Sequence, residues 1–295
     1  MPGRPLNVGP FSRTEQADMA KIKPDEKSLR ELMDAVEADA PARLEPFLKA
    51  GMTADQKVAG AGGITLLGLA IEKNAIRVAK SLIAAGAKLK AGPDKPLIRA
   101  ALLNRKEIVQ LLLEAGANPN VTVSNPDEDV RGETALMHAV DLPEKIGIVE
   151  LLLKHGADPG LANSKGQTAL FQAAEHANVE AVRMLVAAGG KPSGSVLTDL
   201  VYRCTPDSLK TMKLLLEASA DVNDPDHRWS QVRRDALEFA RASYKDKTEL
   251  IDELSRRPRQ GGEQEILERW KSEAQIFQTM IDALETGRGD AVRST

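Results

Sequence analysis

The chain has 295 residues, of which 42% are hydrophobic and 28% charged, and its formal net charge is −3. This hydrophobic content is high enough to build a core and excludes a wholly disordered chain. The nearly balanced charge excludes the strongly basic surface that binds nucleic acid or an anionic membrane, so we expect no nucleic-acid partner.

A single cysteine, Cys204, rules out an intrachain disulfide and a metal cage built from cysteines. The chain has no apolar run of about 18 residues, and Met1 to Pro5 begin no apolar signal segment. We therefore expect a soluble, cytoplasmic protein with no membrane partner. Residues 1–24 carry Pro, Gly and scattered charges without periodicity, which predicts a flexible N-terminal tail.

Residues 25–254 repeat one pattern. An aligned leucine recurs 30 to 39 residues apart, at Leu32, Leu67, Leu97, Leu136, Leu170, Leu200 and Leu237. Four copies of the pattern are clear, and the copies that begin at Leu32, Leu200 and Leu237 are degenerate. Self-similarity at such a period is the signature of a repeat architecture.

Each unit reads as a pair of helices. A threonine that can cap a helix N-terminus opens three of the first helices, at Thr65, Thr134 and Thr168. A glycine suited to a left-handed C-terminal cap ends four of the second helices, at Gly86, Gly116, Gly156 and Gly189. One pair cannot bury its apolar stripe alone, so neighbouring units must stack into a common core.

This pattern resembles the ankyrin-repeat family, whose units read Thr-Pro-Leu-His-x-Ala and then Leu-Leu-x-x-Gly-Ala-Asp-x-Asn. The closest matches are Leu111–Asn120 and Leu214–Asn223. The resemblance implies an all-α solenoid of about six to seven helix-turn-helix units with short β-hairpin fingers. The motif histidine is replaced throughout, for example by Gly68, Met137 and Phe171, so the family's Thr–His hydrogen bonds should be absent.

Three substitutions predict irregular units at the ends of the array. Pro46 falls in the second helix of the first unit, which should be short or kinked. In the sixth unit, Arg203 replaces a small alanine and Ser219 replaces the terminal glycine, so this unit should be distorted.

A breaker-rich linker over residues 255–262 separates the array from a last helix over residues 263–286, and residues 287–295 form a flexible tail. The helix carries one apolar face, made of Ile266, Trp270, Ala274, Phe277, Ile281 and Leu284. Two interpretations remain open for it. The helix either caps the last repeat or binds a partner.

The sequence shows no constellation typical of catalysis, and we expect no enzyme activity, cofactor, metal site or small-molecule substrate. The four histidines have no metal-ligand spacing. Glu175-His176 is either plain solvated surface or a binding contact, and we expect no proton-transfer pair there, since adjacent helical residues point apart. The acidic insertion over 122–130 is either a binding element or a tolerated insertion.

The resemblance implies that first helices and fingers line a concave groove. Carried over position by position, the groove-facing residues are Ile64, Glu72, Lys73, Asp94, Leu102, Leu103, Arg131, Glu133, Asp141, Leu142, Lys165, Gln167, Glu175 and His176. Leu102, Leu103 and Leu142 should form its apolar centre, because large exposed apolar side chains call for a cover.

We therefore expect a protein–protein interaction module that acts as an adaptor, an inhibitor or a regulatory subunit and binds another protein through that groove. Two alternatives remain: a structural module that self-assembles through the C-terminal helix, and an enzyme.

Overall fold

The computed structural model describes residues 26–58, 64–89, 95–122, 132–191, 196–220, 228–256 and 263–286. The elements in these ranges are α2 (Glu26–Glu37), η1 (Pro41–Arg43), α3 (Glu45–Lys49), α4 (Leu66–Lys73), α5 (Ile76–Ala84), α6 (Pro96–Leu102), α7 (Lys106–Glu114), α8 (Ala135–Ala139), η2 (Pro143–Lys145), α9 (Ile146–Lys154), α10 (Ala169–Glu175), α11 (Val179–Ala187), α12 (Val196–Arg203), α13 (Pro206–Ala220), α14 (Arg228–Ser255) and α15 (Glu263–Thr286). The all-α class is confirmed.

The hairpin fingers are reduced to single β-bridges. Within the described ranges, Lys57 bridges Thr65, Thr122 bridges Thr134, and Ala162 bridges Thr168, and no strand forms. Most of the acidic insertion, residues 123–130, lies outside the described residues.

The predicted helix caps are confirmed. The side chains of Thr65, Thr134 and Thr168 each accept a hydrogen bond from the backbone N–H three residues later, at 3.1, 3.3 and 3.3 Å. At the other end, Gly86, Gly116, Gly156 and Gly189 have φ of 86°, 81°, 85° and 87°. A Cβ is strained at such φ values, which is why glycine ends these helices.

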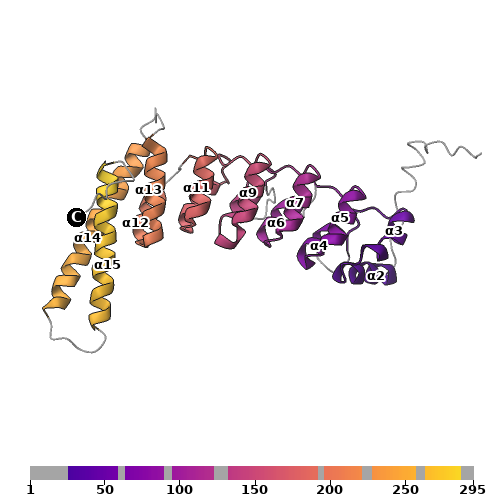
Figure 1. Ribbon diagram of the computed structural model, residues 1–295, viewed down its shortest axis with the longest axis horizontal. Coiled ribbons are helices and arrows are strands. Elements are labelled where there is room, and N and C mark those ends of the chain that lie inside the picture. The colour runs from indigo at the N-terminus through magenta and orange to yellow at the C-terminus, as the bar shows by residue number, and fades with distance from the viewer. Residues whose placement is uncertain are drawn as a thin grey trace, which may run out of the picture. The chain divides into compact units, whose positions relative to one another are not determined.

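The chain forms two compact units, Met1–Asn118 and Pro119–Thr295. In the first unit, α4 contacts α2 and α6, and α5 contacts α7. In the second unit, α10 contacts α8 and α12, and α11 contacts α9 and α13. Each compact unit therefore has one layer of first helices and one of second helices, and Figure 1 labels most of these elements along the chain. The buried leucines and alanines of both layers form the cores.

Polar side chains also join successive repeats. In the first unit, Asp39 Oδ1 accepts a hydrogen bond from the backbone N–H of Val78 at 2.9 Å. In the second unit, Asn178 Nδ2 donates to the backbone oxygen of Val140 at 3.0 Å. Each bond satisfies a backbone group of the neighbouring repeat, so the repeats hold one another in register.

The irregular units follow from their sequences. Helix α3 has five residues, and Pro46 lies in its first turn, where a missing N–H costs little. Helix α13 has 15 residues and continues through Ser219, because no glycine stops it there. Both expectations of irregularity are confirmed.

The prediction of a degenerate seventh repeat over Leu237–Leu254 is wrong. The structure has one continuous helix of 28 residues in its place, α14, since neither Gly nor Pro interrupts the sequence from Arg228 to Ser255. Helix α15 lies beside α14 in a long hairpin (Figure 1) and also contacts α13.

Helix α15 covers the end of the array, as the capping interpretation expects. Ala274, Phe277, Ile281 and Leu284 of its predicted apolar face are buried. The buried face is displaced from the expected one at its start, however, because Ile266 is 46% exposed and Trp270 is partly exposed, whereas Leu267 is 6% exposed.

Candidate functional site

In the first compact unit, the leucines at the end of α6 are exposed. Leu102 is 49% and Leu103 36% exposed, whereas Leu97 at the start of the same helix is 1% exposed. Asn104 follows with a φ of 56°, which stops the helix directly after these leucines. The structure therefore places both leucines on the surface, where the motif positions predicted them.

The other predicted residues of this unit behave differently. Two of them, at the end of α4, already form ion pairs. Glu72 pairs with Arg99, and Lys73 pairs with Glu37 at 2.7 Å. Ile64 was expected on the surface, and this is wrong. It is 4% exposed, because its backbone oxygen accepts a hydrogen bond from Val58 N–H at 2.9 Å and its side chain joins the core. Asp94 lies outside the described residues.

In the second compact unit, Leu142 is the exposed counterpart. It is 49% exposed and precedes η2, while Leu136 of the same repeat is 1% exposed. The neighbouring Asp141 forms an ion pair with Lys145 at 3.0 Å. Lys145 is 3% exposed and also donates to the backbone oxygen of His138 at 3.1 Å. Asp141 therefore stabilises a buried ammonium group and the turn that presents Leu142.

Glu133 is held from two sides. Its carboxylate lies 3.2 Å from Nε2 of His138 in its own repeat. It also accepts a hydrogen bond from Gln172 Nε2 of the next repeat at 3.5 Å. This residue thus links α8 to α10. Arg131, two residues earlier, lies outside the described residues.

Lys165 and Gln167 belong to a finger that Asn163 organises. Asn163 is 5% exposed, and its Oδ1 accepts hydrogen bonds from the backbone N–H groups of Lys165 and Gln167, both at 3.0 Å. Its Nδ2 donates to Gln167 Oε1 at 3.1 Å. The Lys165 side chain is exposed at the tip, and Gln167 is half-buried.

Glu175 and His176 lie at the end of α10. Glu175 is the last helical residue and half-buried, and His176 is the exposed C-cap. Their place at a helix terminus fits a contact at the edge of a binding surface and offers no arrangement for proton transfer.

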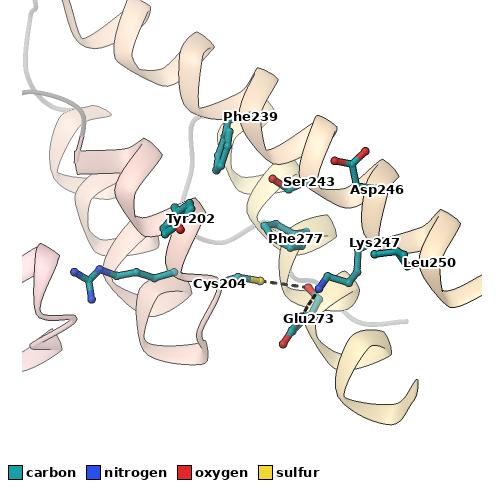
Figure 2. A pocket seen from close by; sticks show the side chains of 10 residues that line it. Tyr202, Cys204, Phe239, Ser243, Asp246, Lys247, Leu250, Glu273 and Phe277 are labelled. Carbon is teal, nitrogen blue, oxygen red and sulfur yellow. Dashed lines mark hydrogen bonds and ion pairs between the residues drawn. The ribbon is translucent and has the colours of Figure 1, made fainter. Parts of the chain in front are cut away.

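Sequence reasoning missed a second feature of the second unit, a cleft of about 380 Å³ between α12, α14 and α15 (Figure 2). This C-terminal cleft is lined by Tyr202, Arg203, Cys204, Phe239, Ser243, Asp246, Lys247, Leu250, Glu273 and Phe277. In the sequence, the one indication of this cleft was Tyr202, because aromatic residues make up only 3% of the chain.

An ion pair forms one side of the C-terminal cleft. Lys247 Nζ lies 2.7 Å from the Glu273 carboxylate and 5.6 Å from the centroid of the Trp270 ring. Burial raises the pKa of Glu273, but hydrogen bonds from Lys247 and Arg269 outweigh it and leave that pKa below its usual value. Glu273 is therefore ionised at neutral pH and balances the charge of Lys247.

Cys204 lies at the end of α12, with its thiol directed toward α15 (Figure 2). Sγ donates to the backbone oxygen of Glu273 at 3.5 Å. Burial, and then repulsion by the Glu273 carboxylate, raise the pKa of the thiol to about 11. The thiol thus stays protonated near neutral pH, and a protonated thiol is a poor nucleophile.

Among the described residues, no group of three or more His, Cys, Asp and Glu side chains is placed to hold a metal ion. In the same part of the chain, no helix combines the length and apolarity that crossing a bilayer requires.

A family model described as ankyrin repeats matches the chain in three overlapping copies, over residues 32–123, 67–163 and 136–226. The matches together cover more than half of the 295 residues and run from within α2 to beyond the end of α13.

Individual relatives match shorter stretches. An ankyrin repeat-containing protein of Treponema pallidum is 37% identical over 127 residues, which are 42% of this chain and 40% of that protein. The B-cell lymphoma 3 protein homolog of Mus musculus is 29% identical over 170 residues, 55% of this chain and 36% of that protein. The 2-5A-dependent ribonuclease of Homo sapiens is 44% identical over 78 residues, 26% of this chain and 10% of that protein. The chain thus spans less than half the length of each of these relatives.

Proposed function

Because this chain belongs to the ankyrin-repeat family, a family of protein-interaction modules, we propose that it binds a partner protein through the ends of its first helices. In this role it serves as an adaptor, an inhibitor or a regulatory subunit. The apolar contacts are Leu102 and Leu103 in the first compact unit and Leu142 in the second, and polar side chains at the ends of the repeats, such as Lys165 and His176, set specificity.

One observation carries this proposal. Leu102, Leu103 and Leu142 are 49%, 36% and 49% exposed, although the stripe leucines of the same repeats are almost fully buried. Water-exposed leucines at equivalent motif positions contribute little to the fold and would gain free energy if a partner covered them.

Self-assembly through α15 has less support. The apolar face of that helix is largely buried, and α15 contacts α13 and α14 of its own chain. The face therefore already has a cover, and a binding role at the first helices remains the better proposal.

The test replaces Leu102, Leu103 and Leu142 together by serine. We expect the melting temperature to change little, since exposed positions usually contribute within about 0.5 kcal/mol each. We expect affinity for a partner, identified by affinity capture and mass spectrometry, to fall by roughly 30-fold or more, which corresponds to about 2 kcal/mol for one central anchor.

Ile266→Ser is the matched control, since Ile266 is a similarly exposed aliphatic residue, at 46%, on α15. It should leave binding unchanged. A folded triple variant that binds like the parent would contradict the proposal. A triple variant that unfolds would show that these leucines belong to the core.

A further inference from the structure

The C-terminal cleft contains none of the leucines proposed above as partner contacts, although one of its walls is the end of α12, the first helix of the sixth repeat. One face of α14 forms one wall, because Phe239, Ser243, Asp246 and Leu250 recur at helical spacing and all line the cleft. Tyr202 and Arg203, in the last turn of α12, form the opposite wall. Phe277 and Glu273 of α15 close it (Figure 2).

Large apolar groups are exposed at this cleft. Tyr202 is 79% exposed, although its ring stacks on Phe239 with a centroid distance of 6.3 Å, and Leu250 is 43% exposed. Phe277, deeper in the cleft, is 6% exposed. A bulky side chain that entered here would contact Phe277 while its own backbone covered Tyr202 and Leu250.

The charges of the cleft are only partly balanced. The Glu273 carboxylate is shared between Lys247, at 2.7 Å, and Arg269, at 2.9 Å. Arg203 on the α12 wall and Asp246 on the α14 wall are both exposed, and neither pairs with another residue in the described part of the chain. The α12 and α14 walls thus each carry one exposed charged side chain with no partner among the described residues, beside an interior that holds Phe277 and the Lys247–Glu273 ion pair.

We infer that the C-terminal cleft docks a segment of a partner protein in which a bulky apolar side chain stands between an acidic residue that pairs with Arg203 and a basic residue that pairs with Asp246. Its volume of about 380 Å³ suits one large side chain and adjoining backbone. A small ligand is disfavoured, because sites for small ligands bury most of the ligand surface, typically about 70–90% of it. A polypeptide continues beyond the cleft and covers the exposed Tyr202 and Leu250.

The experiment selects binders to the full chain from a display library of random peptides of about 12 residues, a length that spans one helical or extended recognition segment. A parallel selection uses the Tyr202→Ala, Leu250→Ser variant. We expect peptides enriched only on the parent chain, with an acidic residue, a bulky apolar residue and a basic residue in their consensus.

Two readouts locate the binding. Bound peptide should slow the alkylation of Cys204, the single cysteine of the chain, at the edge of the cleft. Peptide affinity should fall by roughly 30-fold in the double variant, the equivalent of about 2 kcal/mol, and stay unchanged in the Ile266→Ser control. A selection on the Asp246→Lys variant should yield peptides with an acidic residue in place of the basic residue of the parent consensus.

Three results would overturn the inference: no peptide depends on Tyr202 and Leu250, bound peptides leave Cys204 alkylation unchanged, or the consensus ignores the charge at position 246. Circular dichroism shows whether the double variant folds. If it does not, the Asp246→Lys variant, changed at an exposed position, supplies the same test, because the charge of the peptide consensus should change with it. The serine variant of the first-helix leucines should bind these peptides normally, so the two proposals can fail separately.

Discussion

Asn178 shows how a single side chain couples two repeats. It is 5% exposed, and its Oδ1 accepts a hydrogen bond from the backbone N–H of Ala181 at 3.3 Å, which caps α11. Its Nδ2 donates at 3.0 Å to the backbone oxygen of Val140, at the end of α8. One side chain therefore satisfies an orphan donor of its own repeat and a buried acceptor of the preceding one.

Asn178→Ala should lower the free energy of unfolding by roughly 2–3 kcal/mol, because it removes a cap and leaves a buried carbonyl unsatisfied. Asn178→Ser keeps the cap and is too short to reach Val140, so its effect should lie between those of the parent and the alanine variant. Urea titrations of the three proteins measure this. Glu180→Ala, at an exposed position in the same helix, should have almost no effect. Equal stability of all variants would show that the Val140 contact contributes nothing.

At the scale of elements, α15 is an uneven cap. Phe277 is 6% exposed, whereas Trp270 is partly exposed and lies beneath the Lys247 ammonium. Buried positions run along the helix from Leu267 to Leu284, so Ile266 and Trp270 lie at the margin of the packed face.

Phe277→Ala should therefore destabilise the chain by about 3–5 kcal/mol, the usual cost of emptying a buried aromatic site. Trp270→Ala should cost distinctly less, because part of its ring already contacts water, and Ile266→Ala should stay within about 0.5 kcal/mol. Thermal unfolding followed by circular dichroism gives the order of the three. Trp270→Ala as the most harmful change would mean that the start of α15 is the main contact.

At the scale of the whole molecule, the two compact units are stabilised chiefly by contacts between neighbouring repeats. In such arrays the total stability is the sum of each repeat and its interfaces, so damage at one end fades with distance along the array. In the described structure, the main packing partners of α15 are α13 and α14, which both lie at the C-terminal end of the second compact unit.

A chain cut after Arg259 should lose amide protection most strongly in α13 and α14, less in α11 and α10, and not at all in α4 to α7. Hydrogen exchange measured by mass spectrometry, peptide by peptide on the full and shortened chains, gives this gradient directly. A uniform loss of protection over both compact units would contradict a nearest-neighbour array.

The sequence by itself determined the repeat, the class of fold and the caps. Thr134 and Gly156 act through backbone groups within about one helical turn, so their effects are encoded locally. The exposure of Leu102, Leu103 and Leu142 was predictable for a related reason, since each follows a helical stripe whose period places it off the core.

Only the tertiary structure decided which surface residues were already engaged. Ile64 is buried by its finger, Asp141 is held by a buried lysine, and the wall of the C-terminal cleft joins Cys204 to Glu273, 69 positions later. Contacts of this kind depend on where distant helices pack, and a pattern with a period of a few residues carries no information about them. The continuity of α14 depends on both. Its sequence lacks any helix breaker, but only its packing along α12 and α15 distinguishes one long helix from another repeat.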